Sequence, residues 1–189
     1  MNIYVARHGQ TDLNRQGCWQ GRIDMELNDT GRAQAEEMRE KLKGIRFDKV
    51  YASTLSRAVE TAEIMTGLSK SEIIKDERII EADFGKYDAK PFNTSLRMSL
   101  YWALPEVFPA PPTVESIKEM KNRVQDFLKT IDKQNAENVL LVCHGGIMRV
   151  ISGFLMDRRS GYLWRPRPEN CEVRVFSSDG GRHRLTGRI

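Results

Sequence analysis

The stretch YVARHGQTDLN, residues 4–14, begins as an apolar run and changes at Arg7, His8 and Gly9 into small polar residues that cannot continue a strand. The run over residues 2–6 is too short for a helix and is rich in β-branched and aromatic side chains, which favours a buried strand. Either the polar residues only close a turn, or the strand presents an arginine and an imidazole where a negative group is held.

A second stretch of the same kind is VLLVCHGG, residues 139–146, an unbroken apolar run that ends in His144 and two glycines. The chain has three histidines, and two of them lie at the carboxyl end of a predicted strand and precede a glycine. One such histidine is more often a hydrogen-bonded turn residue than a functional one. Two histidines in matching contexts favour a shared site.

Strand and helix patterns alternate along the rest of the chain. Short apolar runs predict strands over residues 49–52, 72–75 and 171–177. Apolar residues at helical spacing predict helices that begin near Asn28, Leu55, Thr113 and Ile147. Alternating elements with strands that are apolar throughout predict an α/β fold, in which a largely parallel sheet is covered on both faces. In such sheets ligands bind beyond the carboxyl ends of the strands.

The 189 residues carry no repeat, low-complexity segment or linker, which predicts a single domain over residues 1–189. Residues 78–112 contain five prolines, at positions 91, 105, 109, 111 and 112, and lack a regular pattern. Within them, residues 84–112 are expected to form an irregular, lid-like segment that covers another part of the protein.

The composition limits the classes of partner. A net charge of +4 with scattered basic residues suits a small anionic ligand and gives no strong case for nucleic acid. No apolar run approaches the roughly 18 residues of a membrane span, so no membrane partner is expected. The three cysteines form no C-x-x-C pair, which favours a reduced, cytoplasmic setting. The sequence does not indicate an oligomeric state.

Two arginines indicate what the site binds. Arg7 directly precedes His8, and Arg57 in YASTLSRAVETA falls in the first turn of a predicted helix, where a cation is unfavourable unless an anion is bound there. Neither His8 nor His144 has the spacing of a zinc ligand set, so we expect no metal.

Guanidinium and imidazole groups suit phosphoryl transfer, which needs dispersed positive charge, an in-line nucleophile and a proton for the leaving oxygen. A neutral imidazole can be the nucleophile by forming a phosphohistidine. A protonated carboxyl group can supply the proton, and RIIEADFG offers Glu81 or Asp83. The pattern alone does not choose between these two residues.

The segments RHGQTDLN, QGRID, LNDTGRAQA, ASTLSRAVETAEI, EADFG and CHGG, in this order, resemble the histidine phosphatase superfamily, the phosphoglycerate-mutase-like group. The resemblance implies a three-layer α/β/α sandwich with a mostly parallel central sheet. It also implies a phosphomonoesterase, a hydrolase acting on a small phosphorylated metabolite, that needs no metal or organic cofactor.

The resemblance further implies roles for single residues. His8 would be the phosphorylated nucleophile, Arg7, Arg57 and His144 would hold the phosphoryl group, and Glu81 would be the proton donor. The residues that would line the phosphate end of the pocket are Asn14, Gln20, Gly21 and Gly145.

Three features depart from the family or stay open. The chain has GKYDAK where many relatives have G-x-W-E-G, and Cys18 stands where relatives often carry arginine, so substrate identity is open. Glu115 and Ser116 either line the pocket or form a plain helix start. His183 is expected on the surface, and residues 158–168 are expected to be a solvated loop rather than a docking patch.

Two other functions remain as alternatives. A phosphoglycerate mutase would use the same groups, but such mutases generally carry a longer insertion after the acid block. Here that region is modest and holds Leu100, Tyr101 and Trp102, which favours hydrolysis of a bulkier or less polar phosphate. A non-catalytic phosphate-binding module would not need both a nucleophile and an acid.

Overall fold

The computed structural model describes residues 1–105, 107–156 and 167–189, and within them six strands form one sheet in the order β3-β2-β4-β1-β5-β6. The strands are β1 (Asn2–Arg7), β2 (Lys49–Ala52), β3 (Ile74–Lys75), β4 (Asn138–Cys143), β5 (Val173–Asp179) and β6 (Arg182–Arg188). β1, β4, β2 and β3 are parallel, whereas β5 and β6 pair antiparallel at the other edge. The prediction of a mostly parallel sheet is therefore confirmed.

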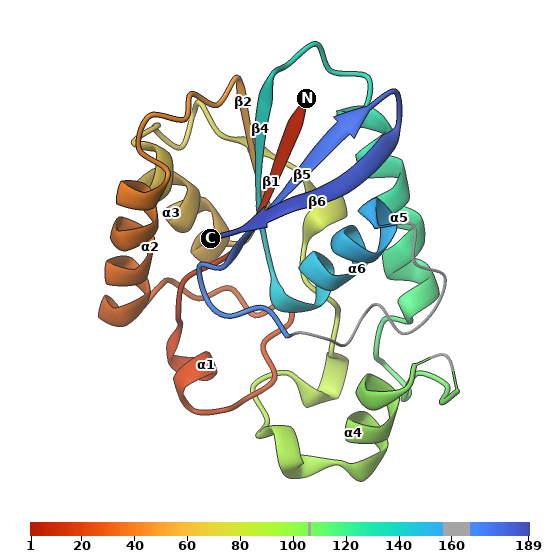
Figure 1. The fold of residues 1–189 in the computed structure, drawn as a ribbon. Helices are drawn as coiled ribbons and strands as arrows, with labels where there is room; N and C mark the ends of the chain where they lie inside the picture. Colours follow the sequence, from red (N-terminus) through yellow and green to blue (C-terminus); the bar gives the residue numbers. More distant parts are fainter. Residues whose placement is uncertain (106, 157–166) are drawn as a thin grey trace.

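Helices cover both faces of the sheet (Figure 1). On one face lie α2 (Asp29–Lys41) and α3 (Ser56–Thr66), and on the other lie α5 (Ile117–Ile131) and α6 (Gly145–Leu155). This arrangement is the expected three-layer α/β/α sandwich.

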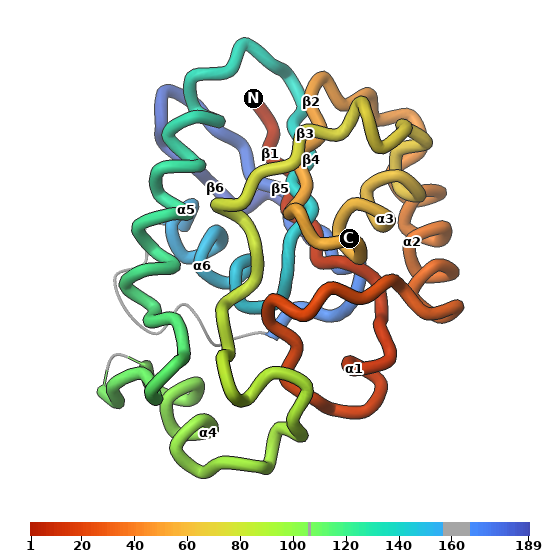
Figure 2. The backbone as a smooth tube through the Cα atoms, turned by 180° about the vertical axis from the view of Figure 1, so that it is seen from behind, coloured from red at the N-terminus to blue at the C-terminus, as the bar shows by residue number. Residues whose placement is uncertain are grey.

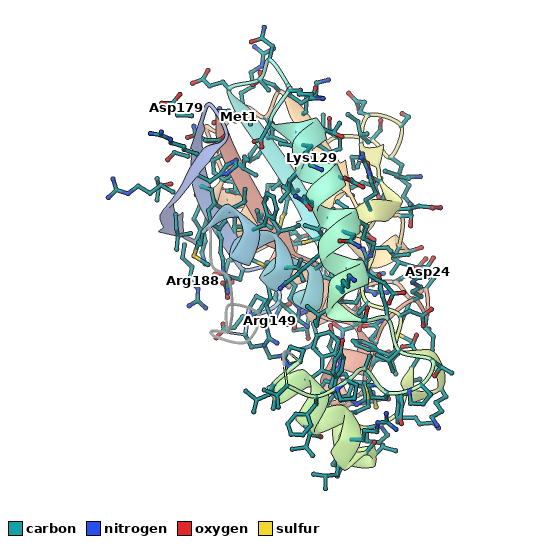
Figure 3. The ribbon with its side chains drawn as sticks, turned by 90° about the vertical axis from the view of Figure 1, so that its right-hand side faces the viewer. Met1, Asp24, Lys129, Arg149, Asp179 and Arg188 are labelled. Atoms are coloured by element: carbon teal, nitrogen blue, oxygen red, sulfur yellow. The ribbon has the colours of Figure 1, made fainter. Side chains whose placement is uncertain are left out.

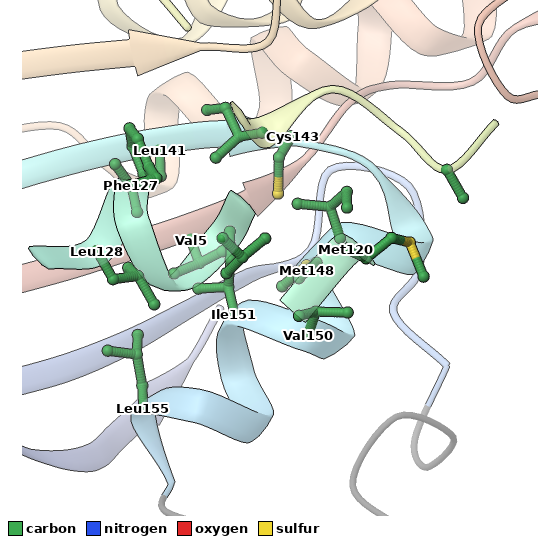
Figure 4. Close-up of a cluster of buried hydrophobic side chains, with 14 of the residues drawn as sticks. Val5, Met120, Phe127, Leu128, Leu141, Cys143, Met148, Val150, Ile151 and Leu155 are labelled. Atoms are coloured by element: carbon green, nitrogen blue, oxygen red, sulfur yellow. The ribbon is translucent and has the colours of Figure 1, made fainter. Parts of the chain in front are cut away.

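Alternate side chains of the central strands enter two separate cores. In β1, Ile3 and Val5 join the core beneath α5 and α6, whereas Tyr4 and Ala6 join the core beneath α2 and α3. Figure 4 shows Val5 and Leu141 of the sheet beside Phe127 of α5 and Ile151 of α6. Burial on both faces explains why these strands are apolar throughout.

Two short helices lie beyond the carboxyl ends of β1 and β4, at the lower end of the molecule in Figures 1 and 2. They are α1 (Asp12–Arg15) and α4 (Leu96–Ala103). Three 3-10 turns complete the described elements: η1 (Glu77–Ile79), η2 (Gly85–Tyr87) and η3 (Phe92–Thr94). The segment between β3 and α5 thus reaches the end of the sheet where ligands are expected.

Several predicted boundaries differ from the structure. β3 has two residues rather than four, and the helix expected from Thr113 begins at Ile117. Thr113 has φ 72°, a left-handed conformation that cannot begin a helix, and Ser116 is the N-cap of a capping box. Helix α4 was not predicted, although Ser95 caps it.

His183, expected on the surface, is partly exposed as a residue, but its side chain packs against the end of α5. His183 lies in β6, its side chain is 6% exposed, and its Nε2 is 2.9 Å from Oδ1 of Asp132 at the end of α5. No described helix is both long enough and apolar enough to cross a membrane.

Candidate active site

The parallel pairing of β1 with β4 brings His8 and His144 together. Arg7 and Cys143 are paired in register at the ends of these strands, so the histidine that follows each strand leaves the sheet at the same level. The two imidazole rings lie 5.1 Å apart between centroids, at an interplanar angle of 60°. Both side chains are buried, His8 being 3% and His144 0% exposed.

His8 is held as a neutral imidazole with a free lone pair on Nε2. Its Nδ1 lies 2.7 Å from the carbonyl oxygen of Gly9. A carbonyl oxygen only accepts hydrogen bonds, so we assign the proton to Nδ1. Burial lowers the pKa of His8 well below 6.5, and the charges of Arg57 and Arg7 add to this effect. The ring is therefore unprotonated at Nε2 at neutral pH.

His144 has the opposite tautomer. Arg57 donates from Nε to Nδ1 of His144 at 3.2 Å, which makes Nδ1 the acceptor and leaves the proton on Nε2. Burial, followed by Arg57 and His8, lowers the pKa of His144 well below 6.5. Nε2 of His144 is buried and has no hydrogen-bond partner among the described residues. One ring thus offers a lone pair and the other an N–H donor.

Arg57 is fully buried at the second position of α3. Its Nη1 donates to the carbonyl of Ile23 at 2.9 Å, and its Nη2 donates to that of Gly21 at 2.7 Å. Burial lowers the pKa of Arg57 to about 10, so the group stays charged at neutral pH. Asp88 holds the loop that supplies these carbonyls by accepting from three successive backbone N–H groups, the shortest being that of Gly21 at 2.6 Å.

Arg7 supplies a second buried cation beside His8. It is 7% exposed, and its Nη1 donates to the carbonyl of Pro168 at 2.9 Å. Burial and the charge of Arg167 lower its pKa to about 10. Its buried Nε has no hydrogen-bond partner among the residues that the structure describes. Such a donor is available to an anion in the site.

Glu81 lies at the amino end of α6. Its Oε2 accepts from Gly146 N at 2.9 Å, and its Oε1 accepts from Ala82 N at 2.9 Å and Ile147 N at 3.3 Å. Arg123 holds the surrounding backbone by donating to the carbonyls of Ile80 at 2.6 Å and Glu81 at 3.3 Å. The carboxyl group therefore has a fixed position in the site.

Asp83 is placed elsewhere, although the sequence pattern left it equal to Glu81. Its side chain is 41% exposed, and it accepts from its own loop at Gly85 N and lies 3.5 Å from Arg22. Glu81 lines the central cavity and Asp83 does not.

Gly146 is required for this position of Glu81. A Cβ atom at Gly146 would lie 2.6 Å from Oε1 of Glu81, a distance that real Cβ atoms do not show. We expect Gly146→Ala to displace the carboxyl group and to slow hydrolysis of esters with poor leaving groups by about 10²-fold. The helix itself should tolerate alanine, which has the higher helix propensity.

The matched control for this variant is Gly187→Ala in β6, where a Cβ would meet Val175 at an ordinary 3.9 Å. Turnover and melting temperature of both variants check the prediction. Wild-type rates for Gly146→Ala with poor leaving groups would contradict it.

Gln20 and Asn14 add a polar wall to the site. Oε1 of Gln20 accepts from Oγ1 of Thr11 at 2.6 Å and from Nδ2 of Asn14 at 3.2 Å, which orients the Gln20 amide. Its Nε2 is buried and has no hydrogen-bond partner among the described residues. Gln20, Asn14 and Gly145 line the cavity. Gly21 does not line it, because its carbonyl faces Arg57 instead.

A cavity of about 380 Å³ joins these groups. Arg7, His8 and Glu81 line it, whereas Arg57 and His144 lie fully buried behind them. Phe84, Phe92, Ser99, Trp102 and Ala103 line it from the segment 84–112 that was expected to cover the site, and Cys18 lines it as well. The lining residues that the sequence analysis did not single out are Trp19, Gly146, Arg149 and Arg167. Arg149 follows Gly145 by four residues on α6, a spacing that places both on one helix face and was a usable signal.

Other sequence expectations fall outside the cavity. Glu115 binds Arg123 at 2.7 Å and Ser116 caps α5, so the plain helix start is the correct alternative. Leu100 and Tyr101 are not among the residues that line the cavity. The segment 158–168 was expected to be a solvated loop. Residues 158–166 lie outside the described residues, and Arg167 lines the cavity.

Groups of three or more His, Cys, Asp or Glu side chains that could hold a metal ion do not occur among residues 1–105, 107–156 and 167–189. The site described here is built instead from arginine, histidine, glutamate and backbone N–H groups. This donor set suits an anionic group with several oxygens.

Comparisons with known proteins agree with this arrangement. The family model for the histidine phosphatase superfamily (branch 1) matches residues 3–188. A relative from Hydrogenobacter thermophilus named "Putative phosphoserine phosphatase 2" is 30% identical over 187 residues, which cover 97% of this chain and 92% of the relative.

Solved structures show the same fold. YhfR from Bacillus stearothermophilus is 28% identical with a TM-score of 0.88, over 97% of this chain and 94% of that one. A phosphoserine phosphatase from Entamoeba histolytica in complex with 3-phosphoglyceric acid is 26% identical with a TM-score of 0.85, over 99% and 95% of the two chains. The chain therefore belongs to the histidine phosphatase superfamily (branch 1) and is an enzyme of the phosphatase class of hydrolases.

Proposed function

We propose that this protein hydrolyses small-molecule phosphate monoesters through a phosphohistidine intermediate on His8, with Glu81 as the proton donor. The observation that supports this most is the opposite tautomers of His8 and His144 in one buried, positively charged site. The His8 lone pair is a nucleophile, and the His144 N–H is a donor to the phosphoryl oxygens. Two imidazoles in the same tautomer would not supply both a nucleophilic lone pair and an N–H donor to the phosphoryl group.

In the first step Nε2 of His8 attacks the phosphorus atom and forms a P–N bond. The bond between phosphorus and the leaving oxygen breaks, and its electron pair stays on that oxygen. Glu81, protonated at this stage, donates its proton to the same oxygen.

In the second step water attacks the phosphohistidine. Glu81, now ionised, accepts a proton from this water, and the P–N bond breaks with its electron pair returning to Nε2 of His8. The products are inorganic phosphate and the enzyme in its starting state. Splitting the displacement into two steps is the usual effect of a covalent intermediate.

The charge of the transferred phosphoryl group is spread over three oxygens, which need several donors. Arg7 Nε, His144 Nε2 and Gln20 Nε2 are buried donors without a partner among the described residues. Arg57 adds a buried charge directly behind them. Donors fixed before the reaction cost no reorganisation during it.

The size of the site supports a small phosphorylated metabolite as substrate. A cavity of about 380 Å³ is within the range of small-molecule sites. Phosphoserine and 3-phosphoglyceric acid, the compounds named for the relatives, belong to this size class. The compounds named for the relatives differ.

We interpret residues 1–189 as one domain in which residues 84–112 cover the cavity, since Phe84, Phe92 and Trp102 line it from that segment. We also propose a cytoplasmic location. Cys18, Cys143 and Cys171 are all free thiols, the state that a reducing compartment maintains.

The test is incubation of the protein with an aryl phosphate in the presence of a metal chelator. We expect steady release of phosphate, because arginine and imidazole groups supply the positive charge that metal ions supply in other phosphatases. Binding without release would favour a phosphate-binding module. Conversion of 3-phosphoglycerate after addition of 2,3-bisphosphoglycerate, with little hydrolysis, would favour a mutase.

A further inference from the structure

The chain that enters β5 passes directly beside His8. β5 runs antiparallel to β1, and Ala6 pairs with Val173, so the residues that precede β5 lie at the carboxyl end of β1. In this entry segment Asn170 donates from Nδ2 to the backbone carbonyl of His8 at 3.0 Å and to Oδ1 of Asn14 at 3.2 Å. The proposed reaction assigns no task to Asn170.

The carbonyl of His8 determines the orientation of the Asn170 side-chain amide. A backbone carbonyl oxygen only accepts hydrogen bonds, and this one also accepts from the backbone N–H of Cys171 at 3.3 Å. The atom of Asn170 that faces it must therefore be the nitrogen, and we assign the amide on this ground. The same nitrogen has a second N–H, which needs an acceptor of its own.

The orientation of Asn170 is passed on to Asn14. The second N–H of Asn170 requires an oxygen opposite it, so Oδ1 of Asn14 faces Asn170. The backbone N–H of Thr11 donates to the same oxygen at 3.4 Å, a distance at which such hydrogen bonds are weak. Asn170 thus makes the shorter of the two bonds that orient Asn14, and Nδ2 of Asn14 is directed toward Gln20.

Asn14 in turn orients Gln20. Its Nδ2 donates to Oε1 of Gln20 at 3.2 Å, which directs Nε2 of Gln20 away from Asn14. The hydroxyl of Thr11 lies 2.6 Å from the same oxygen, but a hydroxyl can donate or accept and would tolerate either orientation. Gln20 lines the cavity, and its buried Nε2 has no hydrogen-bond partner among the described residues.

We infer that Asn170 is a positioning residue for phosphoryl binding. It orients the amides of Asn14 and Gln20 so that Gln20 presents N–H groups, rather than a carbonyl oxygen, to the phosphoryl oxygens. A reversed Gln20 amide would place a partial negative charge against those oxygens. The inference rests on the proposed function, because it assumes that the phosphoryl group binds at Gln20. Asn170 does not line the cavity and takes no part in bond making or breaking.

The test replaces Asn170 by a side chain of the same shape that cannot donate. In Asn170→Asp the carboxylate accepts from Nδ2 of Asn14, which turns Oδ1 of Asn14 toward Gln20 and reverses the Gln20 amide. Binding of benzylphosphonate, a stable analogue of a phosphate ester, is measured by calorimetry. We expect Asn170→Asp to weaken binding by about 30-fold. Asn170→Ala removes the donors without adding a charge and should weaken binding by about 3-fold.

Both variants are then repeated in Gln20→Met, which keeps the shape of the side chain but has no amide. Gln20→Met alone should weaken binding by about 10-fold. In this background Asn170→Asp keeps only the effects of its charge and of its contact with the His8 carbonyl, so it should weaken binding by about 5-fold or less. Asn170→Ala should then cost less than about 2-fold. The difference between the two backgrounds measures how far Asn170 acts through Gln20.

The matched control is Asn2→Ala, which removes another bond between two asparagine amides, from Nδ2 of Asn2 to Oδ1 of Asn138 at 2.9 Å. Asn2 begins β1, and Figure 3 shows the preceding Met1 at the opposite end of the molecule from Arg149 of the cavity. This variant should keep the wild-type affinity. Melting temperatures of all variants verify folding, and Asn170→Ala decides the result if Asn170→Asp does not fold.

Equal effects of the Asn170 variants in the two backgrounds would overturn the inference, because Asn170 would then act on binding without Gln20. Unchanged affinity in both Asn170 variants would overturn it as well. Because this readout needs no turnover, it is separate from the proposed function, which fails if aryl phosphates are not hydrolysed.

Discussion

His8→Ala is expected to lose turnover by on the order of 10⁴-fold or more. The substitution removes the Nε2 lone pair that forms the P–N bond, and the described residues offer no other imidazole with an available lone pair in the cavity. The neighbouring cations remain, so phosphate should still bind. The measurement is the rate of phosphate release from an aryl phosphate, with circular dichroism and melting temperature to verify folding.

The matched control is His183→Ala. His183 lies in β6, distant in the fold from the strand ends, and contacts Asp132. Its loss should reduce the free energy of unfolding by about 1 kcal/mol and leave turnover near wild type. If His8→Ala and His183→Ala had similar activities, the nucleophile would have to be another group.

Glu81→Gln is expected to slow esters with poor leaving groups by about 10²–10⁴-fold. An amide cannot donate the carboxyl proton, so an alkoxide leaving group departs unprotonated. Activated aryl esters, whose leaving oxygen is stable as an anion, should lose much less. The measurement is kcat across a series of esters with graded leaving-group pKa, which should show a steeper dependence in the variant.

Asp83→Asn is the matched control for this series, because Asp83 is a nearby carboxylate outside the cavity. It should keep the wild-type dependence on the leaving group. The assignment of the acid is wrong if Asp83→Asn shows the steep dependence and Glu81→Gln does not.

The buried cations have an energetic cost that is consistent with a binding site. Arg57 is fully buried, and its guanidinium is satisfied by two carbonyls and His144 rather than by a carboxylate. Burial accounts for most of the fall in its pKa to about 10. A buried guanidinium without a direct ion pair is costly in the empty fold and favours the state in which an anion is bound.

The central sheet was predictable because its strands are buried on both faces. Such strands appear in the sequence as continuous apolar runs. Because His8 and His144 follow two of these runs, the position of the site could be predicted as well. The edge strand β6 was harder to predict from the sequence. β6 has the sequence RHRLTGR, and the polar residues of an edge strand hide its pattern. Gly180 and Gly181 between β5 and β6 were an unused hairpin signal.

The inner half of the site was predictable and the outer half was not. Arg7 ends β1 and His8 follows it, while His144 follows the neighbouring strand β4, so sheet geometry alone groups them. Arg167 reaches the cavity from a loop far along the chain, and no local pattern encodes such a tertiary contact. Phe92 and Trp102 likewise come from a proline-containing segment without periodicity.

The most direct test of the central role of His8 is to trap the intermediate. Wild type is mixed with an aryl ester carrying radioactive phosphate, quenched with alkali within milliseconds, digested, and mapped by mass spectrometry. We predict acid-labile, alkali-stable phosphate on the peptide that contains His8, with label that disappears as substrate is exhausted. Steady turnover with no labelled peptide, or with the label on another residue, would contradict the account.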